Sequence, residues 1–299
     1  MTDAALTALR GRSRTLWARL GEVDPRYLVS FLITLILVLG EVRYGILGGY
    51  ERLAIALGVC VATELALARL VGGRGAALPS AYITGISLAL LLKPRADLLW
   101  PFALGAFLAI ASKYVLAYRG RHLWNPSNFA ISLLLVVAPG SVAILSHQWG
   151  NHLATNAVIW AFGLLIASRA RVLHVTLTYV VCYALLAAAR SAIVGTPLLA
   201  ELGPITGPMY QLFIFFMVTD PKTTVGSMRG RIAVAALVAV AEAAIRLAAD
   251  HHVAALSPLY PAPPILALAI VGPVAKAVDL FRRHGGPGGP AGPGTPLAE

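Results

Sequence analysis

The sequence predicts an all-α membrane protein whose chain crosses the bilayer many times. Hydrophobic residues make up 58% of its 299 residues and charged residues only 12%, and the mean hydropathy is +0.77. A soluble domain of this length cannot bury so much apolar surface. Several apolar runs also approach the roughly 20 residues that a helix needs to cross about 30 Å of hydrocarbon.

The first half of the chain contains five apolar segments, which we expect to be helices. Basic residues, often with glycine or proline, separate one segment from the next, as at Arg74, Lys93-Pro94 and Arg119-Gly120-Arg121. The segments are 27–48, 52–71, 78–93, 97–117 and 128–146.

The second half contains five more apolar segments, separated by Arg169 and Arg171, by Arg190, by Asp220-Pro221 and by Asp250. These segments are 153–168, 172–190, 205–220, 231–249 and 263–281. The sequence therefore predicts about ten transmembrane helices. It divides into a basic cytoplasmic segment 1–26, a first half 27–149, a second half 150–283 and a disordered Gly/Pro-rich tail 284–299.

The net charge of +11 favours contact with membrane lipid over contact with nucleic acid, because no soluble domain exists to carry a nucleic-acid site. Lys and Arg concentrate in the short loops on the side of the N-terminus, which predicts that this side is cytoplasmic. Both termini are then inside, and we expect a bacterial inner-membrane protein.

Two short apolar segments read like copies of one element. Thr84–Leu92 ends at Lys93-Pro94, and Leu212–Thr219 ends at Asp220-Pro221. Interrupted segments at matching positions of two halves are a pointer to a binding site at the bilayer midplane. With the predicted orientation the halves run antiparallel, so the sequence predicts a five-plus-five inverted repeat with broken half-helices.

Two polar motifs are candidates for this central site. Thr219, Asp220, Thr223 and Thr224 place a carboxylate and hydroxyls where a helix breaks, with a simple turn or helix cap as the alternative. Asn125 and Asn128 offer amides at a helix N-terminus, which can hold an anion. As an N-cap followed by proline, Asn125 needs no ligand.

Charged residues within apolar segments are the next candidates, because intramembrane charges are costly and usually face a cavity or a partner. Lys113 either faces such a site or snorkels toward the inner surface. Glu242 and Arg246 lie four residues apart and can pair with each other. Glu64 has no evident local partner, which makes it the candidate for an ion or proton site.

Signatures of soluble enzymes are absent from the sequence. Four histidines lie in two loops expected to be outside, but their spacing is not that of helical metal ligands, and no metal site is predicted. These histidines are His147, His152, His251 and His252.

Four motifs follow one another along the chain: Tyr82-Ile83-Thr84-Gly85, Ser112-Lys113-Tyr114 through Arg119-Gly120-Arg121-His122, Asn125-Pro126-Ser127-Asn128-Phe129 and Met217-Val218-Thr219-Asp220-Pro221. They resemble motifs of the NqrB/RnfD family, the flavin-carrying membrane subunits of the sodium-pumping quinone reductase and of the Rnf electron-transport complex. The resemblance covers roughly residues 27–283 and is closest to stand-alone, UnbU-type members.

The resemblance implies an inverted repeat similar to that of urea transporters, together with a flavin. The chain lacks the Ser-Gly-Ala-Thr segment whose threonine binds FMN covalently in the complexes, so a non-covalent flavin (FMN or riboflavin) is expected. Thr219, Asp220, Thr223, Thr224, Asn125 and Asn128 would contact this cofactor, and Lys113 or Arg121 would balance its charge.

Three hypotheses follow from these residues. The first is transmembrane electron transfer, as a subunit of a membrane oxidoreductase, between redox partner proteins or quinone. The second is a transporter or channel for a small solute, such as a flavin or a biosynthetic product, which loss of the covalent segment favours. The third is a scaffold that only docks partner subunits.

Overall fold

The computed structural model describes residues 25–71, 75–95, 97–118, 121–144 and 152–284. The expected N-terminal segment, apart from its last two residues, and the Gly/Pro tail after His284 lie outside this part. The first half contains α2 (Pro25–Tyr44), α3 (Tyr50–Val71), α4 (Leu78–Leu91), α5 (Trp100–Val115) and α6 (Pro126–Val137). Its short strands are β1 (Leu92–Pro94), β2 (Ala117–Tyr118), β3 (Arg121–His122) and β4 (Val142–Ile144).

The second half begins with α7 (Leu153–Arg169) and α8 (Leu173–Val194). A broken stretch follows, made of α9 (Leu198–Leu202), the 3₁₀ turn η1 (Gly203–Thr206), α10 (Pro208–Leu212) and the π-helix η2 (Phe213–Met217). The chain ends with α11 (Met228–Asp250), the 3₁₀ helix η3 (Ala254–Leu259) and α12 (Pro263–His284).

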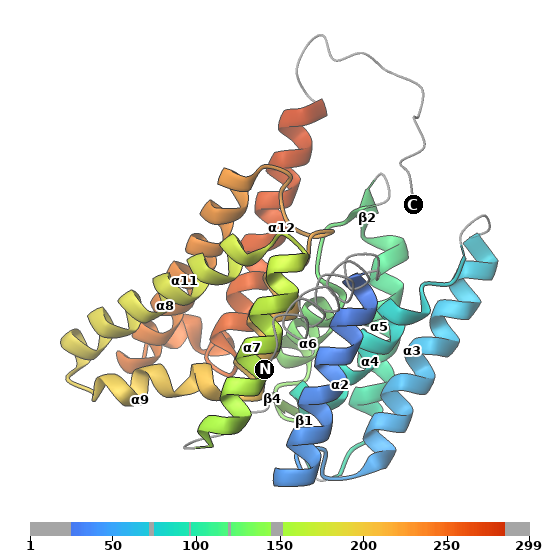
Figure 1. Ribbon diagram of the computed structural model, residues 1–299, viewed down its shortest axis with the longest axis horizontal. Coiled ribbons are helices and arrows are strands. Elements are labelled where there is room, and N and C mark those ends of the chain that lie inside the picture. The colour runs from blue at the N-terminus through green and yellow to red at the C-terminus, as the bar shows by residue number, and fades with distance from the viewer. Residues whose placement is uncertain (1–24, 72–74, 96, 119–120, 145–151, 285–299) are drawn as a thin grey trace, which may run out of the picture.

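Helices from the two halves meet in the middle of the molecule. The helix α3 packs against α4 and α5 on one side, and α8 packs against α11 on the other side. Between these groups, α2 contacts α7, and α6 contacts α12 (Figure 1). The broken helix α10 also contacts α2 and α4.

Proline and glycine account for the local geometry at the broken helices. The first turn of α4, α5, α6 and α10 contains a proline, which costs little there because the first N–H groups of a helix have no intrahelical acceptor. Gly85 in α4 brings the helix against α3, where an added Cβ would lie 3.0 Å from the Cα of Leu57. Gly163 in α7 likewise leaves room for the ring of Phe215.

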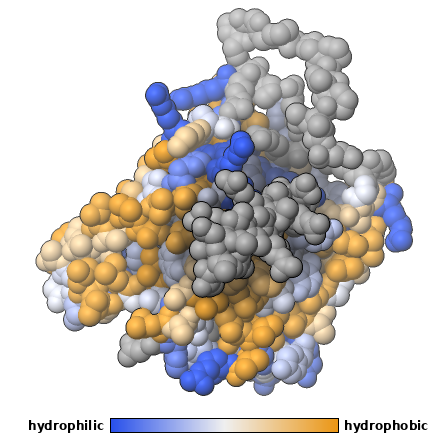
Figure 2. Space-filling model, in the orientation of Figure 1, coloured by the Kyte–Doolittle hydropathy of each residue, from blue (hydrophilic) through white to orange (hydrophobic). Residues whose placement is uncertain are grey.

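Five helices of the described part are long and apolar enough to cross a membrane: Arg26–Tyr44, Tyr50–Val71, Leu173–Val194, Met228–Asp250 and Pro263–Arg282. Figure 2 shows apolar side chains over much of one face, with the most hydrophilic residues toward its upper and lower edges. Many large apolar side chains on these helices are exposed, among them Val42 at 82% and Leu237 at 54%. The described part is thus mainly helical, with five helices suited to a bilayer, which agrees with the prediction of an all-α membrane protein.

Several helix ends differ from the predicted bounds, and two of the differences involve strands. The segment 128–146 does not continue as one helix, because α6 ends at Val137 and the chain turns back into β4. The segment 78–93 ends two residues early, because Leu92–Pro94 forms β1, which pairs with β4 in antiparallel register. Proline marks both ends, at Pro94 and at Pro139-Gly140, and the pairing of the two strands fixes the chain beyond them.

Candidate functional site

The two polar motifs of the sequence meet at the N-terminus of α6. The Asn125 side chain caps α6, since its Oδ1 accepts a hydrogen bond from the backbone N–H of Asn128 at 3.1 Å. Its Nδ2 donates to Oδ2 of Asp220 at 3.2 Å, across 95 residues of chain. Asn128 in turn donates from Nδ2 to the backbone carbonyl of Ile265 in α12 at 2.8 Å.

The hydroxyl and carboxylate groups of the second motif are engaged with nearby backbone. Asp220 accepts from the N–H of Lys222 at 3.0 Å, which is the turn that the sequence offered as the alternative to a ligand. The hydroxyl of Thr219 donates to the carbonyl of Phe215 at 2.8 Å, and that of Thr223 donates to the carbonyl of Asp220 at 3.3 Å. Lys276 in α12 donates from Nζ to the carbonyl of Thr224 at 2.6 Å.

A small cavity lies between these two motifs. Its volume is about 20 Å³, and Asn125, Asn128, Thr223 and Thr224 are among its lining residues. Within the described part of the chain, Oδ1 of Asn128 is buried without a hydrogen-bond partner. A polar cavity of this size has room for about one water molecule, so the central site as it stands is too small for a flavin.

His122 in β3 lies close to this motif. Burial lowers the pKa of its imidazole, while the nearby carboxylate of Asp220 acts in the opposite direction. Burial has the larger effect because desolvation disfavours the charged form. Arg121 precedes it in β3, and the Arg121 side chain lies outside the described part.

Glu64 and Lys113 form a separate buried cluster between α3 and α5. Lys113 lies 3.7 Å from Oε2 of Glu64 and donates to the hydroxyl of Ser80 at 3.0 Å. Oε1 of Glu64 accepts from Tyr114 at 2.9 Å and from the N–H of Ala77 at 3.0 Å.

This cluster gives Glu64 partners that are distant in the sequence. Of the two alternatives for Lys113 it excludes snorkelling, because the side chain is buried at 6% exposure. The sequence did not reveal the cluster because most of its members come from different elements. Among the described residues, the hydrogen bonds of the Glu64–Lys113 pair do not reach Asn125 or Asp220, although Lys113 interacts electrostatically with Lys222 and His122 beside the second motif.

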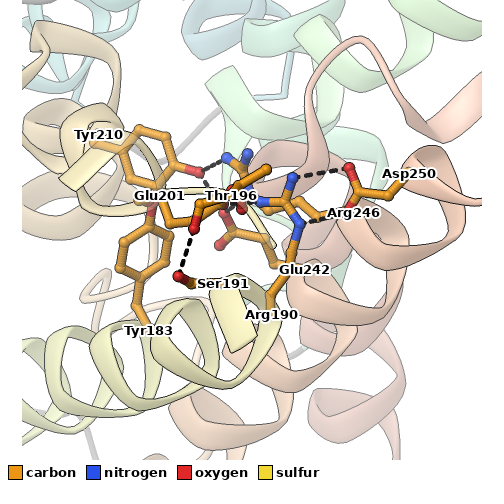
Figure 3. A network of polar contacts seen from close by, with 9 residues as sticks. All are labelled: Tyr183, Arg190, Ser191, Thr196, Glu201, Tyr210, Glu242, Arg246 and Asp250. Atoms are coloured by element: carbon orange, nitrogen blue, oxygen red, sulfur yellow. Dashed lines mark hydrogen bonds and ion pairs between the residues drawn. The ribbon is translucent and has the colours of Figure 1, made fainter. Parts of the chain in front are cut away.

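A larger polar network joins α8, α10 and α11 (Figure 3). Glu242 is 1% exposed and accepts hydrogen bonds from Tyr179 at 2.5 Å, from Arg246 at 3.0 Å and from Tyr210. Arg246 also donates to the Tyr210 hydroxyl. The predicted pairing of Glu242 with Arg246 is therefore confirmed, and two buried tyrosines extend it.

Arg190 forms the second part of this network. It donates from Nε and Nη2 to the two carboxylate oxygens of Asp250, at 2.5 Å and 2.9 Å, and from Nη1 to Glu201. Glu201 also accepts from the hydroxyl of Thr196 at 2.7 Å. The acidic partners lie 11 and 60 residues from Arg190, so no local spacing in the sequence indicated them.

A pocket of about 300 Å³ opens beside this network. Polar and aromatic residues contribute much of its wall, together with prolines from the segments before α10 and α12. The lining includes Arg190, Tyr210, Arg246, Asp250, Tyr260, Pro204, Pro261 and Pro263. This volume is at the lower end of the range of small-molecule sites, so the pocket has room for a compact organic ligand.

Among the described residues, no group of three or more His, Cys, Asp and Glu side chains is arranged to hold a metal ion. Of the histidines considered from the sequence, His147 lies outside the described part. No protein-family model and no curated protein matches the chain.

Proposed function

We propose that the protein is a multi-pass transporter for a small solute, built as a five-plus-five inverted repeat. The contact pattern supports this proposal, because α3 packs on α5 as α8 packs on α11, and α5 packs on α6 as α11 packs on α12. In this scheme α2 and α7 correspond, as do α6 and α12, and both pairs meet across the middle.

The broken helices also support it. The helix α4 has 14 residues, and α10 and η2 have five residues each. At 1.5 Å per residue neither stretch alone crosses about 30 Å of hydrocarbon. Discontinuous helices at matching positions are a recurring feature of transporters, in which the substrate lies near the repeat interface.

The observation that supports the proposal most is a difference in size between two pockets at opposite ends of the described bundle. The pocket reaches Tyr210 on the broken helix, whereas the side of Asn125 and Asp220 has only a cavity of about 20 Å³. A carrier that alternates between an outward-open and an inward-open state likewise has a pocket that is open on one side and closed on the other. In the orientation predicted from the basic loops, the pocket faces outside and the termini lie in the cytoplasm of a bacterial cell.

Sequential cysteine labelling tests alternating access. Ala249→Cys introduces a thiol in the pocket, here called the pocket thiol, and Thr223→Cys introduces one at the other end, the inner thiol. The same variant carries Cys60→Ala and Cys182→Ala, which remove the native thiols.

A bulky membrane-impermeant reagent first modifies the pocket thiol in right-side-out vesicles, and a permeant reagent then reports the reactivity of the inner thiol. We expect the first adduct to slow the second reaction severalfold, because a carrier held open on one side stays closed on the other. An unchanged rate would contradict a carrier.

A second candidate function is transmembrane electron transfer by a non-covalently bound flavin, as in the NqrB/RnfD family that the chain resembles. The hydrogen bond between Asn125 and Asp220 favours it, because it joins two of the motifs on which the resemblance rests. A π-helix directly before Asp220 adds support, since π-bulges occur frequently at functional sites. The small central cavity places this candidate second, because a flavin would require the site to open.

The visible absorption spectrum of the detergent-purified protein distinguishes the two candidates. A carrier is expected to be colourless, whereas a flavin protein would be yellow and would release its pigment on denaturation. If pigment is present, Asp220→Asn should lower its retention at a near-wild-type melting temperature, since Asn keeps an oxygen that can accept from Lys222. A parallel loss of folding would instead show that Asp220 serves the turn.

A further inference from the structure

The pocket beside Arg190 and Arg246 is lined by charged side chains that are themselves held by hydrogen bonds. Two guanidinium groups and one carboxylate, Asp250, line it. The other two acids of the network, Glu201 and Glu242, are 7% and 1% exposed and do not line this pocket. The wall that a ligand meets therefore exposes two guanidinium groups and one carboxylate, while Glu201 and Glu242 balance the guanidinium charges from the buried side.

Arg246 retains hydrogen-bonding capacity in this wall. A guanidinium has five N–H donors, and Arg246 uses Nε for Glu242 and Nη2 for Tyr210. Its planar fork matches a carboxylate or phosphate, which accepts two parallel hydrogen bonds. Arg190 holds Asp250 and Glu201, so its charge is already balanced and Arg246 is the guanidinium left for a ligand.

The remainder of the lining suits an apolar body. Tyr210 and Tyr260 contribute rings, and Met209 with the neighbouring prolines contributes further apolar surface. The residues that lead into α12, Pro261 and Ala262, also line the pocket and add apolar surface.

We propose that this pocket binds a small organic anion, with its carboxylate or phosphate against Arg246 and its apolar body against Tyr210 and Tyr260. This inference rests on the proposed function, because it names the solute class that the transporter would accept. It differs from the flavin expectation, which concerned Asn125, Asp220 and their neighbours.

Equilibrium dialysis of anthranilate against the full chain in phosphatidylcholine nanodiscs tests the proposal. Anthranilate is a compact aromatic carboxylate, and anthranilamide is its neutral counterpart. We expect saturable binding of anthranilate and more than tenfold weaker binding of anthranilamide, because hydrogen bonds to a charged group contribute about 1.5–3 kcal/mol. Equal binding of both compounds, or no saturable binding of anthranilate, would overturn the proposal.

Two variants locate the site. Ala249→Phe fills the pocket without a change of charge, and Ala244→Phe makes the same substitution at an exposed position of α11 that does not line the pocket. The first should weaken anthranilate binding about tenfold or more, and the second should leave it unchanged. Binding unaffected by Ala249→Phe would place the site elsewhere and refute the proposal.

The double variant Arg246→Gln/Glu242→Gln tests the role of the guanidinium without leaving a buried carboxylate unpaired. We expect it to lose the preference for anthranilate over anthranilamide while retaining a wild-type elution profile in size-exclusion chromatography. A retained preference would contradict the proposed role of Arg246.

The lipid composition of the nanodisc tests whether the anion is a lipid headgroup. If anthranilate is displaced when phosphatidylglycerol replaces part of the phosphatidylcholine, the pocket binds a lipid headgroup, and the proposal of a free solute is overturned.

Binding in a nanodisc involves no transport step, so the two proposals fail separately. Anthranilate binding without anthranilate uptake by proteoliposomes, together with an unchanged labelling rate of the inner thiol, would support the pocket and refute the carrier. If modification of the pocket thiol slows labelling of the inner thiol but anthranilate does not bind, the carrier is supported and the anion site is refuted.

Discussion

Glu64 and Lys113 show how charged residues are accommodated within apolar helices of this protein. Their side chains are 3% and 5% exposed, and each has hydrogen-bond partners from a neighbouring segment. A buried pair of this kind adds little net stability, but removing one member leaves a charge without its partner.

We therefore expect Lys113→Met to destabilise the protein by about 3–5 kcal/mol. The double variant Lys113→Met/Glu64→Gln should lose much less, because Gln carries no charge and can still accept from Tyr114 and Ala77. Thermal unfolding in detergent, followed by tryptophan fluorescence, measures the difference. If the double variant is at least as unstable as Lys113→Met, the two residues are not coupled.

The sequence was informative about single residues only where their partners are close in the chain. Asn125 as an N-cap, Asp220 in a turn and the Glu242–Arg246 pair were all foreseen as structural alternatives, and the structure confirms them. Glu64 was assigned no partner because Tyr114 lies 50 residues away. Arg190 was treated as a loop charge for the same reason, although it anchors the network beside the pocket.

At the scale of elements, close contact between helices depends on glycine at a few positions. An added Cβ on Gly163 of α7 would lie 2.4 Å from the ring of Phe215 in η2. Trp160, one turn earlier on α7, also packs edge to face against this ring at 5.2 Å. The π-helix is therefore held against α7 by an aromatic contact that requires a glycine.

Gly163→Ala should destabilise the protein by about 1–3 kcal/mol, the usual range for overpacking of a well-packed core. Gly58→Ala in α3 is the matched control, because nothing lies within 4 Å of its added Cβ. The control should be neutral or stabilising by about 0.5–1 kcal/mol, since Ala loses less backbone entropy than Gly in a helix. Equal melting temperatures for the two variants would contradict the close approach of α7 to η2.

Hydrophobic runs predicted which segments are helical but not where all of them end. The stretch 128–146 is apolar throughout most of its length, yet its last part forms β4 by pairing with β1. The partner strand is about 50 residues away, so its pairing has no signal within the segment, but Pro139-Gly140 directly after α6 is a helix stop that the predicted bounds overlooked. In contrast, the ends at Lys93-Pro94 and Asp220-Pro221 were recognised because proline and charge disfavour a continued helix.

At the scale of the whole molecule, the predicted orientation decides what the pocket can meet. The connection between α3 and α4 contains Arg74, and Arg69 lies in the last turn of α3, so the positive-inside rule places this end in the cytoplasm. The pocket lies at the C-terminal end of α11, near Asp250. In an inverted repeat with ten crossings, this end faces outside.

Two single-cysteine variants test this arrangement in intact bacterial cells, in the background without Cys60 and Cys182. Gly75→Cys lies beside α4 at an exposed position where an added Cβ has no neighbour within 4 Å, and Ala249→Cys lines the pocket. An impermeant maleimide should label the pocket thiol in intact cells, and should label the thiol beside α4 only after permeabilisation. The reverse pattern would place the pocket in the cytoplasm, where the anion would be an intracellular metabolite on its way out. The inverted repeat requires the α3–α4 connection and the α11–η3 connection to lie on opposite sides of the membrane. Labelling of both thiols in intact cells would place the two connections on the same side and contradict the inverted repeat on which the transport proposal depends.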